Sequence, residues 1–342
     1  MIALRTTRRL ATDVLVGVSP SLLTRMTRAP LVIPYYHVVS DEDLWHVKHL
    51  YGYKSPKQFI EDLEFLLRYY SPIGLPDLLD HVKRGRALPS RALLLTFDDG
   101  FREMHDVVAP ILSAKGVSAT FFVNSAFIDN VGLCYLNKAS LLIEHVRRKA
   151  SRAANAALAR LLGRHQVRAR DLESGIRAIT YEKRVVLDEL VAAADVDVAG
   201  YLAERQPYLT SAAIETLIVR GFHIGAHSVD HPLYASLPLD EQIRQTVTSV
   251  TTIRNRFGLP YGAFAFPHSD HGVSEEYFQR VAATGTVDLS FGEAGLLGDS
   301  VAGHLQRFSV ENPLEPAPRI LAYHHARRLG KMLTGLARVT RQ

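Results

Sequence analysis

The sequence has very little cysteine and no long apolar run. Cys134 is the only cysteine among the 342 residues, so no disulfide can form within the chain and no oxidising compartment is implied. A zinc site built from several thiolates is excluded as well, and any metal must be held by histidine or carboxylate side chains. No segment reaches the uninterrupted apolar length of a membrane span, so we expect no transmembrane helix.

The chain also lacks a large excess of charge of either sign. The formal net charge is +5 and the pI is near 9.2. This mild basic excess is compatible with anionic lipid or an acidic substrate, but it is too diffuse to indicate nucleic acid, and we expect no nucleic-acid partner. Apolar residues make up 47% of the chain, enough to bury the core of one large domain or two ordinary ones.

The first 30 residues lack a clear signal peptide. Three arginines precede the apolar stretch 10–18, but Asp13 interrupts that stretch and no small-residue cleavage site follows it. The pattern favours an amphipathic basic helix that ends near Ser19 and Pro20 and packs on its own domain. The alternative is a helix that lies on an anionic membrane. We therefore expect a cytoplasmic protein, or one attached peripherally to the cytoplasmic membrane.

The most informative stretch is 92–100, where an apolar run ends in Asp98, Asp99 and Gly100. The run is typical of a strand buried on both faces of a parallel sheet, and the apolar spacing after Gly100 predicts a helix. Adjacent side chains on an extended backbone point opposite ways, so the two carboxylates cannot share one role. Helix capping accounts for only one of them. We interpret the pair as functional, because catalytic groups collect at strand ends in α/β folds.

Similar apolar runs recur along the chain, and most of them precede a helical pattern. They cover residues 31–36, 118–123, 221–226, 261–266, 286–290 and 305–310. This repetition predicts an α/β fold, either a parallel barrel or a doubly wound sheet.

The same patterns divide the chain into four parts. They are an amphipathic segment over 1–30, the α/β domain over 31–134 and 208–315, a helical insertion over 135–207, and a basic C-terminal helix over 316–342. The insertion is rich in alanine, arginine, leucine and glutamate and has no proline before Pro207. The last part has no acidic residue, and we expect it to dock as a helix; electrostatic attachment to a membrane is the alternative.

His227 and His231 follow another predicted strand and form a second group. Two imidazoles four residues apart can face one point from a helical or tight turn. A metal needs at least a third ligand, and Asp99 would complete a site with two histidines and one carboxylate that leaves positions open for water and substrate. Asp230, in the same turn, is the rival ligand. If Asp99 binds the metal, Asp98 is free to act as a base.

A divalent metal beside a free carboxylate suits hydrolysis of an amide or an ester. Such a metal lowers the pKa of bound water from about 15.7 to about 7 and polarises the carbonyl, while the carboxylate takes the proton. Ligand type alone does not separate zinc from cobalt or nickel. The leaving group needs an acid, and His37, His268 and His271 are candidates because each follows a predicted strand.

Two motifs carry a resemblance to a known family. Thr96-Phe97-Asp98-Asp99-Gly100 and His227-Ser228-x-x-His231-Pro232 resemble, in sequence and order, the first two motifs of the polysaccharide deacetylase superfamily, carbohydrate esterase family four. The resemblance covers 31–134 and 208–312. It implies a distorted (β/α)₇ barrel that removes N-acetyl groups from amino-sugar polymers with zinc or another divalent metal.

The resemblance also implies roles for individual residues. Asp98 corresponds to the general base, and Asp99, His227 and His231 correspond to the metal ligands. The third family motif usually has an arginine that orients the base, but the matching stretch 264–267 has none.

The late family motif that ends in the acid histidine has no match either, since the surroundings of His304 differ. With both departures, the chain resembles the branch of poly-N-acetylglucosamine deacetylases from biofilms. In that branch a Tyr-His pair near the first strand supplies the acid. Tyr36-His37 fits this pattern, so the resemblance implies His37 as the acid.

The expected substrate is therefore an N-acetylated amino-sugar glycan. We expect Phe266, Pro267 and His268 to contact it, with Arg307 contributing a cation or, alternatively, forming a surface salt bridge. Two other hypotheses stay open. The absence of a clear secretion signal favours a deacylase or deformylase of a lipid-linked sugar, and the missing motif arginine favours a catalytically weak carbohydrate-binding barrel.

Overall fold

The structure is a computed structural model that describes residues 12–13, 15–149 and 151–341. The chain divides into two compact units. Unit 1 comprises Met1–Asp41, Tyr53–Ser125 and Thr210–Gln342, and unit 2 comprises Glu42–Gly52 and Ala126–Leu209. The segment 42–52, which sequence analysis places in the α/β domain, thus groups with the insertion. Most of the predicted N-terminal helix, residues 1–11 and 14, lies outside the described residues.

Unit 1 is built on one large sheet in which every neighbouring pair of strands is parallel. Its order is β11-β9-β8-β7-β6-β5-β2-β12. The strands are β2 (Pro34–Tyr36), β5 (Leu95–Phe97), β6 (Ala119–Val123), β7 (His223–Ala226), β8 (Ala263–Ala265), β9 (Leu289–Gly292), β11 (His304–Gln306) and β12 (Phe308–Ser309).

The two edge strands of this sheet are consecutive in the chain, and Arg307 alone separates them. β11 pairs with β9, whereas β12 pairs with β2 at the opposite edge. The backbone N–H of Arg307 donates to Gly292 O (3.0 Å), and that of Phe308 donates to Ile33 O (3.2 Å). Residues 304–309 therefore bridge both edges, and the sheet closes as a distorted seven-stranded barrel. The expected fold class is confirmed.

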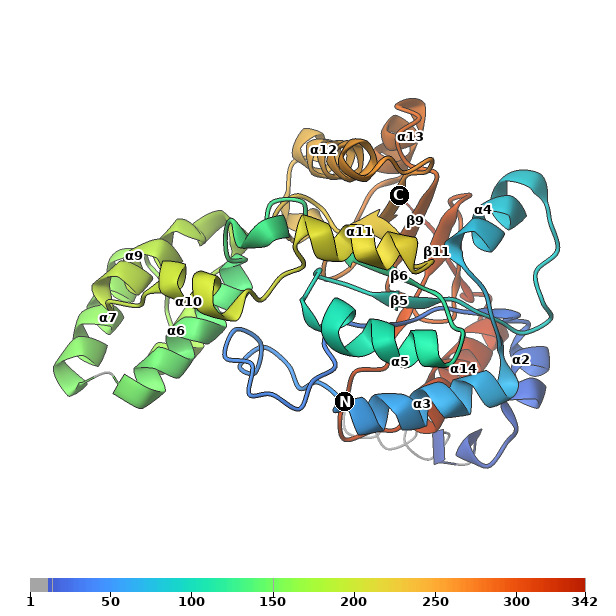
Figure 1. The fold of residues 1–342 in the computed structure, drawn as a ribbon, viewed down its shortest axis with the longest axis horizontal. Coiled ribbons are helices and arrows are strands. Elements are labelled where there is room, and N and C mark those ends of the chain that lie inside the picture. Colours follow the sequence, from blue (N-terminus) through green and yellow to red (C-terminus); the bar gives the residue numbers. More distant parts are fainter. Residues whose placement is uncertain (1–11, 14, 150, 342) are drawn as a thin grey trace. The chain divides into compact units, whose positions relative to one another are not determined.

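Helices cover the outside of the barrel (Figure 1). In unit 1 they are α2 (Pro20–Thr27), α3 (Pro56–Tyr69), α4 (Leu75–Arg84), a π-helical turn (Met104–Val108), α5 (Ala109–Ala114), α11 (Ser211–Val219), a 3-10 turn (Tyr234–Ser236), α12 (Leu239–Phe257), α13 (Glu275–Ala283) and α14 (Ala317–Leu333). The sequence signals fit: Ser55 and Gln58 form a reciprocal capping box at the start of α3, and Gly258 ends α12 in the left-handed conformation.

The chain ends of unit 1 pack together through α2 and α14. Ser19 caps α2, so a second helix begins where sequence analysis expects the N-terminal helix to end. The hydroxyl of Thr27 lies 2.9 Å from His325 Nδ1, and Arg328 donates to Thr27 O (2.6 Å). α14 is thus a docked helix. No described helix has the length and apolarity that crossing a membrane requires.

Two smaller sheets extend the barrel. β1 (Leu31–Val32) and β3 (Ser71–Pro72) pair with β4 (Ala92–Leu93), which continues into β5. β10 (Gly298–Asp299) pairs with β13 (Arg338–Val339), so the segment after α14 is fastened beside the loop that follows β9.

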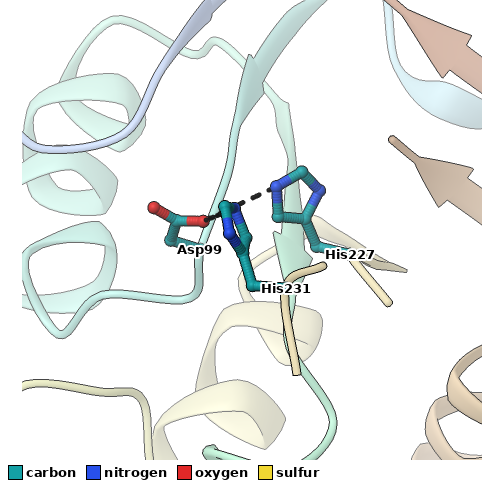
Figure 2. Close-up of side chains that lie close together, drawn as sticks. All are labelled: Asp99, His227 and His231. Atoms are coloured by element: carbon teal, nitrogen blue, oxygen red, sulfur yellow. Dashed lines mark ion pairs between the residues drawn. The ribbon is translucent and has the colours of Figure 1, made fainter. Parts of the chain in front are cut away.

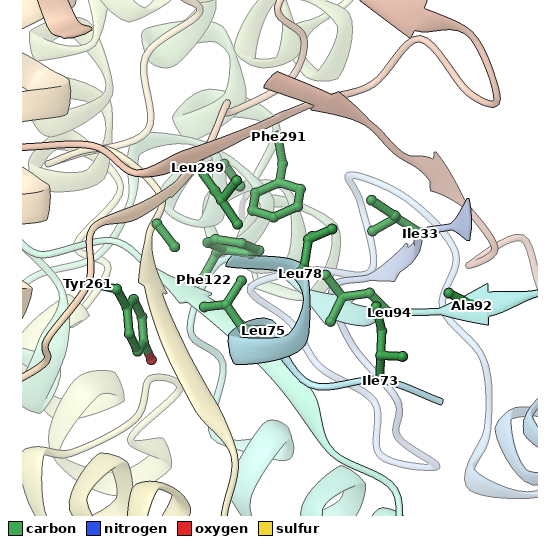
Figure 3. Packing of buried hydrophobic residues seen from close by; sticks show 12 residues of the cluster. Ile33, Ile73, Leu75, Leu78, Ala92, Leu94, Phe122, Tyr261, Leu289 and Phe291 are labelled. Carbon is green, nitrogen blue, oxygen red and sulfur yellow. The ribbon is translucent and has the colours of Figure 1, made fainter. Parts of the chain in front are cut away.

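An apolar cluster fills the barrel at the amino ends of its strands. Ile33, Leu94, Tyr261 and Leu289 lie before or at the start of their large-sheet strands, and α4 adds Leu75 and Leu78 from outside the sheet (Figure 3). Phe122 and Phe291 pack in the same cluster with ring centroids 5.3 Å apart. Because apolar side chains occupy this end, polar groups can collect only at the carboxyl ends of the strands.

Unit 2 is helical and contains the segment 135–207 that sequence analysis predicts as an insertion. Its helices are α6 (Tyr135–Lys149), α7 (Arg152–Arg164), α8 (Leu172–Arg177), α9 (Val185–Ala193) and α10 (Val198–Arg205), with short 3-10 turns at Ile128–Asn130 and Tyr181–Lys183. Leu142, Ile143, Ile176, Leu187 and Leu190 form its buried core. The segment 42–52 joins this unit because His49 and Lys48 pair with the buried Glu144 of α6.

A glycine at the start of β8 tests the barrel packing. A Cβ on Gly262 would lie 1.9 Å from the carbonyl oxygen of Thr286, whereas one on Gly330 of α14 would meet nothing within 4 Å. We expect Gly262→Ala to lower the free energy of unfolding of unit 1 by about 1–3 kcal/mol through overpacking. The matched change Gly330→Ala should raise it by up to about 1 kcal/mol, because alanine favours a helix. Chemical denaturation checks both, and equal effects would contradict the packing.

Candidate functional site

Polar side chains follow the carboxyl ends of the barrel strands and meet at one rim. His37 follows β2, Asp98 and Asp99 follow β5, His227 follows β7, and Glu293 follows β9. Arg307 lies between β11 and β12, which close the barrel, and Glu311 follows β12. Since all these strands are parallel, their ends share one face, which brings together residues far apart in sequence.

Asp99, His227 and His231 converge on one point (Figure 2). Asp99 Oδ1 lies 3.1 Å from His231 Nε2 and 3.5 Å from His227 Nε2. Both histidines are buried, and the Asp99 side chain is 13% exposed. Burial raises the pKa of the Asp99 carboxyl, but attraction to His231 outweighs this effect and holds it well below its ordinary value. Asp99 therefore stays ionised.

His227 is fixed in one tautomer. Its Nδ1–H donates to the carbonyl oxygen of Ala265 (2.9 Å), which leaves the Nε2 lone pair facing Asp99. Its own backbone N–H donates to Val123 O (2.9 Å), and Asn124 donates to His227 O. Burial lowers the pKa of His227 to about 4, so the ring is neutral at pH 7. A neutral imidazole whose second nitrogen donates to a carbonyl is the usual state of a metal ligand.

These three residues fit a divalent metal. With metal–ligand distances of 2.0–2.1 Å and tetrahedral angles, two ligand atoms lie about 3.3 Å apart, close to both observed separations. Asp99 Oδ1 is buried and has no hydrogen-bond partner among the described residues, as expected of an atom whose partner is an ion. The rival ligand Asp230 does not join the group, because it accepts a hydrogen bond from Gln245 (2.8 Å).

The backbone around this point is strained. Asp99, Ser228, His231 and His268 have φ values of 76°, 70°, 67° and 59°, although none is glycine. Each such residue costs about 1–3 kcal/mol and persists only where the surrounding contacts impose it. One such contact is the hydrogen bond from the His231 backbone N–H to Ser228 Oγ (2.9 Å). This clustering is typical of functional sites.

Asp98 is held by Arg307 in a fully buried, two-pronged ion pair. Arg307 Nη1 donates to Asp98 Oδ1 (2.7 Å) and Nη2 donates to Oδ2 (2.8 Å). Neither side chain is exposed. Burial raises the pKa of Asp98, but Arg307 outweighs it and the net shift is downward. Sequence analysis expects Arg307 to contact the substrate or to form a surface salt bridge. Its guanidinium is instead buried and pairs with Asp98, the proposed base.

His37 is paired with Glu311. Its Nδ1 lies 2.6 Å from Glu311 Oε2, while Glu311 Oε1 accepts the backbone N–H groups of His37 (3.0 Å) and Val38 (2.9 Å). Burial lowers the pKa of His37, but attraction and hydrogen bonding to Glu311 outweigh it and raise the pKa to about 10. The ring is therefore protonated at neutral pH, as a general acid must be.

Tyr35 contacts one member of each pair, His37 of the His37–Glu311 pair and Arg307 of the Arg307–Asp98 pair. Its ring packs edge-on against His37 (5.5 Å between centroids), and the Arg307 guanidinium lies over it at 4.8 Å. The Tyr35 hydroxyl donates to Glu293 (3.0 Å). Burial raises the pKa of Glu293 to about 7.

The other predicted substrate contacts differ in exposure. Phe266 is fully buried among aromatic rings, and Pro267 is buried too, so neither can meet a substrate. Both belong to the core because β8 ends inside the aromatic layer under α13. His268 has an exposed side chain, and its ring lies 4.5 Å from that of His231. His271 is exposed and lines a cleft of about 530 Å³, which Glu293 also lines.

Sequence analysis misses Glu311, Glu293 and the role of Arg307. The strand-end rule that selects Asp98 and Asp99 could have found both glutamates, because Glu293 directly follows β9 and Glu311 lies two residues after β12.

The sequence profile described as Polysaccharide deacetylase matches residues 85–168, which include the Asp98-Asp99 motif. This part of the chain is similar to the polysaccharide deacetylase family. No curated protein matches the chain significantly in sequence.

Three solved structures share the fold of this chain. IcaB from Ammonifex degensii is 15% identical with a TM-score of 0.54, covering 87% of this chain and 97% of its own. Deacetylase PplD from Streptococcus pyogenes is 13% identical with a TM-score of 0.53, covering 84% and 95%. A de-N-acetylase from Aggregatibacter actinomycetemcomitans is 14% identical with a TM-score of 0.51, covering 86% and 99%. At these identities the likeness establishes the fold.

Removing Arg307 tests the buried pair. We expect Arg307→Met to lower the free energy of unfolding by about 3–5 kcal/mol, because Asp98 is left buried without a counter-ion. The change should also raise the pKa of Asp98. Denaturant titration measures the first effect. The control Arg319→Met removes a partly exposed salt bridge to Asp13 and should change stability by less than about 1 kcal/mol. Equal effects would contradict the burial of the pair.

Removing Glu311 tests the state of His37. The pKa of His37 is raised above its ordinary 6.5, so the pair contributes its full stability below about pH 6.5 and loses it as the pH rises through about 10. In Glu311→Gln the main group that raises the pKa of His37 is lost while burial still lowers it, so the pKa of His37 should fall. Histidine NMR titration measures this shift. Glu315→Gln, at a more exposed carboxylate nearby, should leave the titration unchanged.

Proposed function

We propose that this chain is a metal-dependent hydrolase that removes N-acetyl groups from the amino sugars of a glycan. The observation that carries the proposal is the convergence of Asp99, His227 and His231 beside two separately paired titratable groups, Asp98 and His37. One group is ionised and the other is protonated at the same pH, which suits a base and an acid acting in sequence.

Asp98 is the proposed general base. It takes a proton from water as the water oxygen bonds to the amide carbonyl carbon. Arg307 engages both carboxylate oxygens, so it fixes the plane of the carboxylate and keeps it ionised before the reaction. The low pKa makes Asp98 a weak base, so it needs a water molecule that is already acidified.

His37 is the proposed general acid. It donates a proton to the amide nitrogen as the C–N bond breaks, and the products are acetate and the free amine. Glu311 orients the ring by binding Nδ1, so the transferred proton comes from Nε2. The same carboxylate stabilises the protonated ring until the nitrogen takes its proton.

Asp99, His227 and His231 would hold the metal, and zinc is the best match to two imidazoles and one carboxylate, with cobalt and nickel as alternatives. A divalent ion bound there supplies a Lewis acid that polarises the carbonyl and lowers the pKa of water. The residues themselves contribute fixed donor atoms: Ala265 orients His227, and Ser228 holds the turn that carries His231.

The substrate class rests on the family. The resemblance to poly-N-acetylglucosamine deacetylases and the shared fold with a de-N-acetylase support an N-acetylated amino-sugar polymer. His268, exposed beside His231, is the remaining candidate for a substrate contact among the residues that sequence analysis selects.

Acetate release from N-acetylglucosamine oligomers tests the proposal. We expect no activity after chelation and recovery on adding zinc. Asp99→Ala should lower metal content and reduce kcat/KM by more than about 100-fold, beyond the loss seen for residues that only support a ligand. The matched variant Asp230→Asn should keep both, because Asp230 pairs with Gln245.

Three outcomes would overturn parts of this account. Activity that persists in the presence of the chelator would show that the reaction does not depend on a metal. Release of formate from N-formyl sugars in preference to acetate would assign a deformylase. Oligomer binding without hydrolysis by any metal-loaded form would assign a carbohydrate-binding barrel.

A further inference from the structure

A second buried polar cluster lies beside the site and contains an arginine from the segment after α14. We call it the Arg341 cluster; its members are Asp270, Asp299, His304, Gln306 and Arg341. Arg341 Nη2 donates to Asp299 Oδ2 (2.6 Å) and to Asp270 Oδ2, and Nη1 donates to Asp270 O (2.7 Å). All five side chains are at least nine-tenths buried.

The cluster brings two carboxylates together. Gln306 Nε2 donates to both Asp270 Oδ2 and Asp299 Oδ2 at 2.8 Å, so these oxygens are near neighbours. Two buried carboxylates this close repel each other unless a cation lies between them. Arg341 is that cation, and its guanidinium also lies over the ring of Phe278 at 4.9 Å.

Asp270, Asp299 and His304 also have the spacing of a metal-binding group. The guanidinium already supplies the charge that an ion would bring, and His304 has partners on both nitrogens, Ser290 at 2.7 Å and Asp270 at 3.1 Å. The cluster is therefore complete without a metal.

Two covalent links join the Arg341 cluster to the reactive groups. Asp270 lies in the loop after β8, two residues beyond His268, whose ring packs on the proposed ligand His231. Gln306 directly precedes Arg307, the partner of the proposed base. The cluster thus holds both the rim loop and the closing strand.

A third link is a hydrogen bond across the rim. Asp270 Oδ1 accepts the backbone N–H of Glu293 (2.9 Å), the residue that binds Tyr35. The arginine reaches this position because β13 pairs with β10, with Val339 opposite Asp299. Without Arg341, Asp270 and Asp299 would repel each other, and Asp270 lies on the rim loop that carries His268.

We propose that Arg341 is a positioning residue for the deacetylation: by neutralising Asp270 and Asp299 it locks the loop 267–271, and with it His268, against the metal-binding residues. The proposal rests on the proposed function for its kinetic part. Arg341 itself touches neither the metal-binding residues nor the base, so its effect on the rate passes through the loop.

Kinetics of Arg341→Ala test the proposal. We expect kcat/KM for N-acetylglucosamine oligomers to fall at least about tenfold, because misplacing a site group by about 1 Å can cost 100-fold. Metal content should be unchanged. The matched control Arg338→Ala removes a neighbouring arginine of β13 that binds only the backbone oxygen of Asp299, and it should keep full activity.

A charge-balance rescue separates positioning from folding. If Arg341 acts by neutralising two carboxylates, Arg341→Ala combined with Asp299→Asn should recover most of the lost activity, because only one carboxylate remains. Arg341→Lys should recover part of it, since lysine keeps the charge without the fork. Losses that multiply in the double variant would contradict the mechanism.

Hydrogen exchange gives a readout that needs no activity. The Glu293 amide, whose partner is Asp270 Oδ1, should exchange faster in Arg341→Ala than in the wild type or Arg338→Ala. Unchanged exchange would overturn the loop lock even if deacetylation is established. If the Glu293 amide exchanges faster in Arg341→Ala but the wild-type protein shows no deacetylase activity, the loop lock is retained and only the proposed function is overturned.

Discussion

The Arg307–Asp98 ion pair is the interaction on which the rest of the site depends. Arg307 is the residue at which the closing strand changes partner from β9 to β2, so the closure of the barrel and the clamping of Asp98 occur at one position. Without this guanidinium, burial would raise the pKa of the Asp98 carboxyl. The barrel therefore fixes both where the proposed base stands and that it is ionised.

The site separates an acid from a base by giving each its own partner. Asp98 faces a guanidinium, and His37 faces the carboxylate of Glu311, so their pKa values move apart although both lie at the same rim. Tyr35 lies against both His37 and Arg307 and fixes their spacing. The strained backbone at Asp99 and His231 brings their side chains to within ligand spacing of His227.

The sequence predicts much of this fold because local signals are strong. Buried strands such as 92–97 read as apolar runs, and the Ser55 capping box and Gly258 mark helix ends. The sequence does not predict that β11 and β12 pair at opposite edges of the same sheet, because this closure depends on pairing between residues far apart in the chain. For the same reason, the segment 42–52 cannot be assigned to unit 2 from composition.

Within the candidate site, motif spacing selects the groups that follow strands, including His37, Asp98, Asp99, His227 and His231. It fails for Phe266, whose exposure depends on the aromatic layer around β8, and for Arg307, whose partner lies 209 positions away. Glu311 and Arg341 act through charges on other strands. Their roles follow from three-dimensional proximity, which no local pattern contains.

X-ray absorption of the zinc-loaded protein tests the central claim most directly, because it counts ligands without requiring a substrate. The account expects one zinc per chain with two imidazole nitrogens and one carboxylate oxygen at about 2.0–2.2 Å. A centre with a single imidazole, as Asp270, Asp299 and His304 would give, or no bound zinc at all, would contradict it.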